Sequence, residues 1–176
     1  MVYGTSIAQG GCASRPGMAW PTILARRIDR PAINLGFSGN GKLDPEMGPL
    51  LAELDPVVYV VDCLHNCGSL GRSEIEQRLS GLVDAIRARR TAPIVFVGKS
   101  AIDNLVAVDE RSHWQETAME RLRARGTRDL FVVPGKALNG TDGDATVDGV
   151  HPNDLGMLRH AEALEPLVRR LAEGGR

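Results

Sequence analysis

The sequence predicts a three-layer α/β/α sandwich around a five-stranded parallel sheet. Short runs of β-branched residues alternate with stretches of helical periodicity along the chain, which is typical of right-handed βαβ units. The third run, Val57 to Val61, is apolar throughout, as expected of a central strand covered on both faces. The 176 residues fit a single domain of residues 1–176 with a sizeable core.

Five strands are expected where the β-branched runs occur. The first run, Met1 to Tyr3, is unusually short, which favours a chain that is part of a longer protein. The predicted strands are Val2–Tyr3, Ala32–Leu35, Val57–Val61, Ile94–Val97 and Leu130–Val133.

Helices are expected between and after these strands. Asp44 precedes Pro45 and is predicted to cap the second helix, with proline at its first position. Ser73 and Glu76 have the spacing of a capping box for the third helix. The predicted helices are Met18–Asp29, Pro45–Leu54, Glu74–Arg90, Arg111–Arg125 and Asp154–Leu171.

Reactive and hydrogen-bonding residues lie in the segments that follow the predicted strands or return to their ends. In open parallel sheets, binding sites lie beyond the carboxyl ends of the strands. Four segments reach that edge, and they offer a serine, a glycine-rich turn, an asparagine and an aspartate–histidine pair. In this order they fit a nucleophile, two oxyanion donors and a base with its orienting acid. The segments are Gly4–Ile7, Gly36–Gly41, Asp62–Asn66 and Asp148–Pro152.

These segments resemble the conserved blocks of the SGNH, or GDSL-like, hydrolase superfamily. The stretches Tyr-Gly-Thr-Ser-Ile, Asn-Leu-Gly-Phe-Ser-Gly-Asn-Gly and Asp-Gly-Val-His-Pro-Asn-Asp-Leu-Gly are similar to a branch that holds bacterial carbohydrate acetylesterases and some acyltransferases. The resemblance implies the flavodoxin-like fold of that superfamily. Members of the branch often carry a β-sandwich domain ahead of the hydrolase domain, so we expect a longer protein in which such a domain precedes this chain.

The resemblance also assigns roles by position. It makes Ser6 the nucleophile, His151 the base and Asp148 the acid that orients the base. The expected oxyanion donors are the main-chain N–H groups of Ser6 and Gly39 and the side-chain amide of Asn66. This chemistry is physically sensible, because a serine hydroxyl needs an imidazole to take its proton and the intermediate's negative charge needs preorganised donors.

The expected function is therefore that of a serine esterase that hydrolyses small acyl esters, acetyl esters of carbohydrates among them, through an acyl-serine intermediate. An acyltransferase with the same acyl-enzyme and a non-catalytic binding module are the alternatives. Neither a metal nor an organic cofactor is expected.

Two departures from the superfamily pattern stand out. The common Gly-Asp-Ser is Gly-Thr-Ser here, which leaves Ser6 itself unchanged. The acid that usually follows the asparagine of the third block is replaced by Cys67. This replacement leaves open how the loop that carries Asn66 is held in place.

Other interpretations of these segments fit less well. The glycines of residues 36–41 do not follow the spacing of a nucleotide-binding loop. The aspartates at 142, 144 and 148 suggest a calcium loop but lack its glutamate at the twelfth position. His65 lies near Cys63 and Cys67 without a fourth metal ligand at suitable spacing, so structural thiols are expected. His113 and His160 are expected to be exposed, and Trp20 and Trp114 to pack against the sheet.

The charge composition limits the classes of binding partner that are expected. Lys+Arg 21 against Asp+Glu 22 gives a net charge of -1, which favours neither nucleic acid nor an anionic membrane. A small-molecule ester, such as an acetylated sugar, is the expected partner, and the oligomeric state stays open. Three cysteines, an odd number, favour free thiols and a reducing compartment. The N-terminal residues lack a signal-peptide pattern, so a cytoplasmic location is expected.

Overall fold

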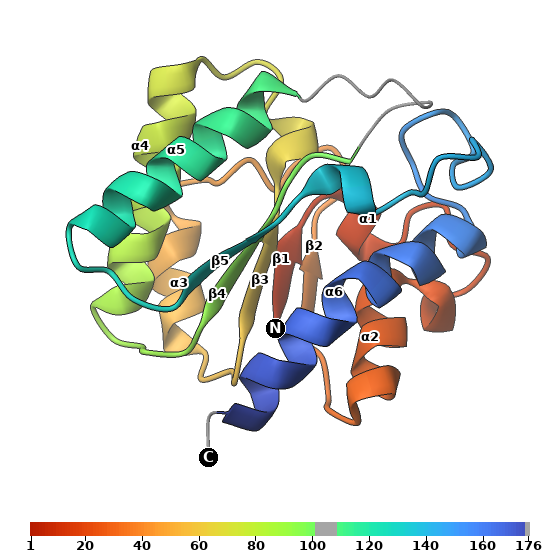
Figure 1. Ribbon diagram of the computed structural model, residues 1–176, viewed down its shortest axis with the longest axis horizontal. Coiled ribbons are helices and arrows are strands. Elements are labelled where there is room, and N and C mark those ends of the chain that lie inside the picture. The colour runs from red at the N-terminus through yellow and green to blue at the C-terminus, as the bar shows by residue number, and fades with distance from the viewer. Residues whose placement is uncertain (101–108, 175–176) are drawn as a thin grey trace.

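The computed structural model describes residues 1–100 and 109–174 of the chain. Five parallel strands form one sheet in the order β2-β1-β3-β4-β5 (Figure 1). The predicted parallel sheet is thus confirmed, and β3 is its central strand. The strands are β1 (Val2–Gly4), β2 (Asn34–Gly36), β3 (Tyr59–Asp62), β4 (Ile94–Val97) and β5 (Leu130–Val133).

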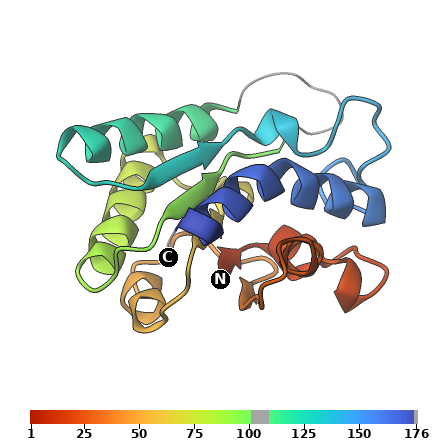
Figure 2. The same ribbon diagram turned by 60° about the horizontal axis from the view of Figure 1, so that its bottom comes forward.

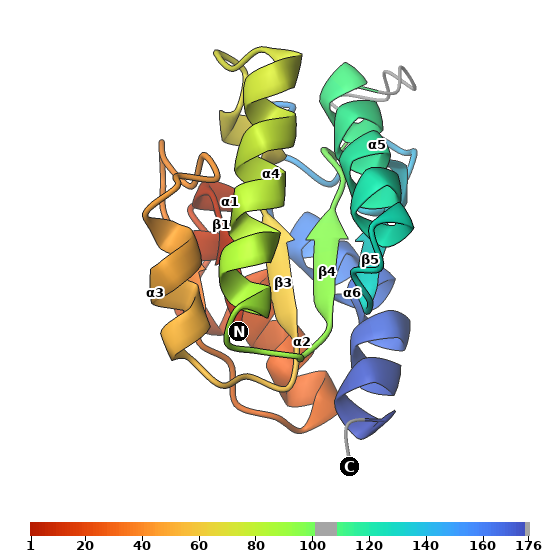
Figure 3. The ribbon, with the colours of Figure 1, turned by 90° about the vertical axis from the view of Figure 1, so that its left-hand side faces the viewer.

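Helices cover both faces of the sheet, which confirms the three-layer architecture (Figures 2 and 3). One face carries α1 (Ser6–Gln9), α2 (Trp20–Ile28) and α6 (Asp154–Gly174). The opposite face carries α3 (Met47–Glu53), α4 (Arg72–Arg87) and α5 (Glu110–Ala124). Short 3₁₀ turns lie at Pro16–Met18, Leu64–Asn66 and Gly135–Ala137.

Alternation along each strand divides the core into two clusters. On β3, Tyr59 and Val61 pack under α3, α4 and α5, while Val60 packs under α2 and α6. All four residues of β3 are buried, and the apolar run predicted this for Tyr59 to Val61. The predicted start of this strand at Val57 is wrong, because Val57 precedes the strand and is 53% exposed. Trp20 is buried on the α6 side, which agrees with its predicted packing. Trp114 is partly buried on the other side and agrees as well.

The predicted start of α3 is wrong by two residues. Pro45 and Glu46 form a turn, and the helix begins at Met47, whose N–H donates to the Asp44 carbonyl at 2.9 Å. The Asp44 carboxylate does not cap this helix. It accepts hydrogen bonds from the Lys42 N–H at 3.2 Å and the Tyr3 hydroxyl at 3.4 Å, so it stabilises the preceding loop.

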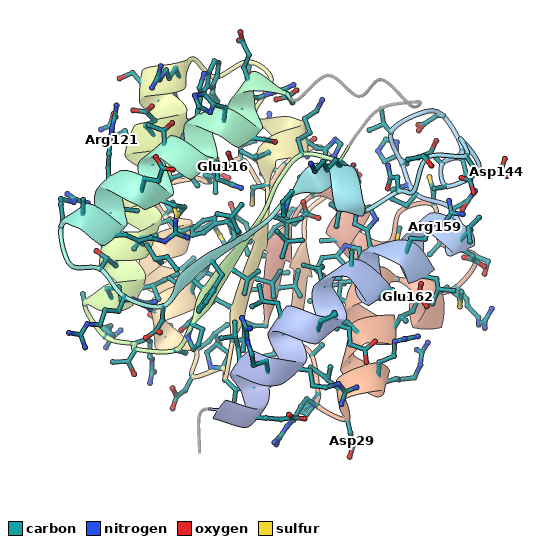
Figure 4. All side chains as sticks on the ribbon, in the orientation of Figure 1. Asp29, Glu116, Arg121, Asp144, Arg159 and Glu162 are labelled. Atoms are coloured by element: carbon teal, nitrogen blue, oxygen red, sulfur yellow. The ribbon has the colours of Figure 1, made fainter. Side chains whose placement is uncertain are left out.

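The predicted capping box of α4 is also wrong. The helix begins at Arg72 with Gly71 as its N-cap, so Ser73 lies inside the first turn. The Glu76 carboxylate pairs with Arg72 at 2.8 Å and with Arg121 of α5, and Figure 4 shows Arg121 at the surface. An ion-pair network between two helices therefore replaces the expected cap.

His160 is buried, contrary to the prediction that it would be exposed. It lies on the face of α6 that packs on the sheet, together with Met157, Ala161 and Leu164. The His160 imidazole lies 3.1 Å from the Gly156 carbonyl through Nδ1, and burial lowers its pKa to about 4. His113 is exposed, as expected. In the described ranges, none of the helices combines the length and apolar character that a membrane span requires.

Candidate active site

The candidate nucleophile stands in a tight strand-to-helix turn. β1 ends at Gly4, and Ser6 begins α1. The Thr5 side chain caps α1 by accepting a hydrogen bond from the Ile7 N–H at 3.3 Å. A Cβ at Gly4 would lie 2.7 Å from the Ala8 Cβ, so glycine allows the helix to fold back against the strand. The turn places Ser6, which is 8% exposed, at the carboxyl edge of the sheet.

Ser6, His151 and Asp148 form one series of hydrogen bonds. The Ser6 Oγ lies 3.0 Å from His151 Nε2, and His151 Nδ1 lies 2.7 Å from Asp148 Oδ2. A carboxylate only accepts hydrogen bonds, so the ring proton belongs on Nδ1. Nε2 is then free to accept the Ser6 proton. The structure thus brings together the three residues that the sequence selected, in the geometry of a nucleophile, a base and an orienting acid.

The Asp148 carboxylate is held by its own turn. Its Oδ1 accepts hydrogen bonds from the N–H groups of Val150 at 2.9 Å and His151 at 2.7 Å. These bonds, together with the imidazole, lower the pKa of Asp148 to about 2. Gly149 has a φ of 85°, which this turn requires, and its N–H donates to the Thr146 hydroxyl at 3.1 Å. The acid therefore stays ionised at neutral pH.

Two further contacts join the segments beside Asp148–Pro152, which we call the base loop, to the rest of the domain. The Ser14 N–H and hydroxyl donate to Asp154 at 2.8 and 2.6 Å, which joins the loop after α1 to the start of α6. Arg159 of α6 pairs with Asp142 and donates to the Asn139 carbonyl at 2.9 Å. Figure 4 shows Arg159 and Asp144 at this corner. The sequence carried no signal for these distant pairs.

The aspartates near this loop do not converge on a common point. Asp142 pairs with Arg159, whereas Asp148 binds the His151 imidazole. Their oxygens are therefore committed to different partners.

The loop after β2 lies against the end of β1. The Phe37 N–H donates to the Gly4 carbonyl at 2.9 Å, and the Asn40 N–H donates to the Phe37 carbonyl at 3.0 Å. Gly39 has a φ of 70°, as the third residue of a type II turn requires. Among the described residues, the Gly39 N–H has no acceptor. It is thus available as a donor on the loop whose first residue, Phe37, bonds to the end of β1.

Asn66 lies on the loop on the other side of β1. It ends the 3₁₀ turn Leu64–Asn66, and its side-chain amide donates one hydrogen bond to the Asn40 carbonyl. An amide nitrogen carries two hydrogens, and among the described residues the second one has no acceptor. The structure joins the loops that carry Gly39 and Asn66. Within the described ranges, neither residue hydrogen-bonds to Ser6 itself.

Cys63 and Cys67 are buried free thiols, as the sequence predicted. The Cys63 thiol points to the Tyr3 carbonyl at 3.8 Å, and the Cys67 thiol points to the Cys63 carbonyl at 3.4 Å. Burial raises the pKa of Cys67 to about 11. The His65 imidazole instead faces Ser100 at 2.7 Å. These groups therefore serve separate structural contacts.

A comparison with models of protein families found a match that covers most of the chain. The model described as the GDSL-like Lipase/Acylhydrolase family matches residues 1–169. A comparison with curated proteins found no match.

Several solved structures are similar in fold. A protein described as a GDSL-like lipase from Bacteroides ovatus is 34% identical, with a TM-score of 0.85, over 98% of this chain and 52% of that protein. A salicylyl-acyltransferase from a tetracycline biosynthetic pathway is 22% identical, with a TM-score of 0.82, over 97% and 53%. A family two carbohydrate esterase from Clostridium thermocellum, in complex with cellohexaose, is 16% identical, with a TM-score of 0.78, over 99% and 64%. The chain spans about half the length of the first two proteins.

Proposed function

The chain belongs to the GDSL-like lipase/acylhydrolase family, and from this premise we propose that it is a serine esterase that cleaves small acyl esters through an acyl-Ser6 intermediate. One observation carries the proposal. The Asp148 carboxylate, the His151 imidazole and the Ser6 hydroxyl are hydrogen-bonded in series at 2.7 and 3.0 Å. This series supplies a nucleophile with a positioned base.

In the proposed first half-reaction, the Ser6 Oγ attacks the ester carbonyl carbon while its proton passes to His151 Nε2. The ionised Asp148 stabilises the resulting imidazolium. The negative charge on the carbonyl oxygen is stabilised by the N–H groups of Ser6 and Gly39 and by the second amide hydrogen of Asn66. The intermediate then collapses, the bond to the alcohol oxygen breaks, and His151 protonates that oxygen.

In the proposed second half-reaction, water attacks the acyl-Ser6 carbonyl. His151 Nε2 takes a proton from the water, and a second tetrahedral intermediate forms. Its collapse breaks the bond to the Ser6 Oγ, which recovers its proton from His151. A free carboxylic acid leaves, and the enzyme returns to its starting state.

The proposed substrates are acetyl esters, with acetylated sugars as the first class to test. This proposal is supported by the fold shared with the carbohydrate esterase that was solved with cellohexaose. Identity of 16% to that protein supports the shared fold alone, so the sugar class rests on analogy.

Turnover of p-nitrophenyl acetate tests the proposed chemistry. The Ser6→Ala variant should lose ~10⁴- to 10⁶-fold in kcat, because the covalent step disappears. Ser73→Ala removes an exposed hydroxyl on α4 and should leave kcat unchanged. If wild-type protein shows no turnover above that of Ser6→Ala, a non-catalytic binding module becomes the better account.

Acyl transfer is the second candidate, because the chain shares its fold with a salicylyl-acyltransferase. The same acyl-Ser6 intermediate would then be attacked by an alcohol in place of water. Product analysis with an activated ester and a candidate alcohol distinguishes the two reactions. An excess of free acid supports the esterase, whereas an excess of the new ester supports the transferase.

A further inference from the structure

The loop that carries Asn66 is joined to the end of β4 by a pair of polar side chains. Ser100 is 2% exposed, and its Oγ lies 2.7 Å from His65 Nε2. The Ser100 N–H donates to the same nitrogen at 3.2 Å. A ring nitrogen that accepts from a main-chain N–H carries no proton, so the ring proton is on Nδ1. His65 is therefore a neutral acceptor of hydrogen bonds.

The surroundings keep this imidazole neutral. Burial, with added effects of the positive charges of Lys99 and Arg111, lowers the pKa of His65 to about 3. The acceptor on Nε2 is thus present throughout the neutral pH range. The pair is suited to holding two loops together.

At its other end, the same loop is joined to the loop after β2. Asn66 donates from its side chain to the Asn40 carbonyl, next to Gly39. The Asn66 N–H also donates to the Cys63 carbonyl at 3.2 Å, which closes the 3₁₀ turn. The sheet order is β2-β1-β3-β4 (Figure 1), so these bonds link the loop after β4 to the loop after β3, and that loop to the loop after β2, past the end of β1. We call the contacts Ser100–His65 and Asn66–Asn40 the oxyanion brace.

We propose that His65 is a positioning residue, whose bond to Ser100 fixes the turn Leu64–Asn66 so that the free amide hydrogen of Asn66 faces the oxyanion. The inference rests on the proposed function. The family pattern places an acid after the asparagine, and Cys67 stands there in this chain. The loop is anchored instead by His65, one residue before Asn66. Oxyanion donors act mainly in the transition state, so their displacement lowers kcat and leaves KM nearly unchanged.

Steady-state turnover of p-nitrophenyl acetate by two substitutions of one residue tests the role. His65→Leu removes the acceptor and should lower kcat by about 10- to 10²-fold, with KM changed by less than about threefold. His65→Gln offers a side-chain oxygen at the same reach and should recover most of kcat. The core variant Ile86→Val, on α4, should keep wild-type kcat. Wild-type kcat in His65→Leu, or no recovery in His65→Gln, would overturn the inference.

A double-substitution cycle separates positioning from general destabilisation. Asn66→Ala should lower kcat by ~10²- to 10³-fold. If His65 acts through Asn66, adding His65→Leu to this variant should cause no further loss, whereas losses that multiply would refute the inference. If Asn66→Ala keeps wild-type kcat, the oxyanion assignment fails and the positioning role falls with it, while the Ser6→Ala result still stands.

A milder variant covers the case in which His65→Leu does not fold. Ser100→Ala removes the hydroxyl and keeps the main-chain N–H that donates to His65. It should lower kcat by about three- to tenfold at constant KM, and this loss should vanish in the Asn66→Ala background. An unchanged kcat in Ser100→Ala would count against the brace.

Discussion

The base loop and the two oxyanion loops, Gly36–Gly41 and Asp62–Asn66, are built in different ways. Asp148 contacts His151 and Val150, which lie within three residues of it. The oxyanion brace instead joins segments 26 and 35 residues apart in sequence. One turn therefore positions the proposed acid and base together. The proposed oxyanion donors depend on the sheet, which must bring separate loops to one edge.

Two carboxyl groups show the same contrast. Asp148 is exposed and accepts three hydrogen bonds, and its pKa is lowered to about 2. Asp62, at the base of the loop that carries Asn66, is 2% exposed, and its pKa is raised to about 7 by burial. Among the described residues, its Oδ2 has no hydrogen-bond partner. The base loop thus stabilises a charge, whereas the root of the oxyanion loop disfavours one.

The largest expected effect comes from breaking the base loop. Asp148→Asn should lower kcat by about 10⁴-fold, because an amide favours the wrong imidazole tautomer and does not stabilise the imidazolium. The measurement is kcat for p-nitrophenyl acetate. Asp144→Asn, an exposed position that Figure 4 shows in the same loop, should keep wild-type kcat. A similar kcat in the two variants would contradict the role of Asp148.

The next effect concerns stability at the root of the oxyanion loop. The folded-state pKa of Asp62, about 7, exceeds the unfolded value of about 4, so the folded state binds the proton more tightly. The contribution of Asp62 to the free energy of unfolding should therefore fall as pH rises from about 4 to about 7, by at most ~4 kcal/mol. Asp62→Asn should remove this fall. Urea unfolding of both proteins at pH 4.5 and pH 8 measures it, and equal pH dependence would refute the prediction.

A third substitution displaces the loop after β2, which carries Gly39, without removing a donor. Gly41 has a φ of 70°, and a Cβ there would lie 2.3 Å from the Gly4 carbonyl oxygen. Gly41→Ala should push the loop away from β1 and lower kcat by about 10²-fold. Gly81→Ala on α4 meets no atom within 4 Å and should instead stabilise the helix by about 1 kcal/mol. Turnover and thermal unfolding of both variants test the difference.

The smallest expected effect comes from the contact between Ser14 and Asp154. Ser14→Ala removes the hydroxyl and keeps the main-chain N–H that also binds Asp154. We expect a loss of about 1 kcal/mol in stability and a two- to fivefold lower kcat, by estimate from one exposed hydrogen bond. A loss of ~10²-fold would show that the base loop depends on distant contacts after all.

Much of the fold could be predicted because its signals are local. Ile94–Val97 and Leu130–Val133 are strands with the predicted bounds, since buried apolar runs define them. The helix starts at Met47 and Arg72 were missed, because turn geometry and a glycine cap decided them. The burial of His160 was missed because one polar residue on an apolar helix face looks the same as an exposed one.

The candidate site also has parts that could be predicted from the sequence and parts that could not. The resemblance to the superfamily paired Asp148 with His151, and the rule that sites lie beyond the carboxyl ends of parallel strands placed Ser6 at the correct edge of the sheet. Their catalytic roles stay predictions. The pairing of His65 with Ser100 could not be predicted, because it depends on how two parallel strands set their neighbouring loops. Contacts of this kind require coordinates.

The hydrogen bond between Ser6 and His151 joins residues 145 positions apart. During synthesis the Ser6 hydroxyl therefore leaves the ribosome long before the imidazole that contacts it. Until the turn ahead of α6 reaches the edge of the sheet beside α1, the proposed nucleophile has no base. The proposed esterase turnover would thus report that the last helix has docked, with little background from products truncated before residue 151.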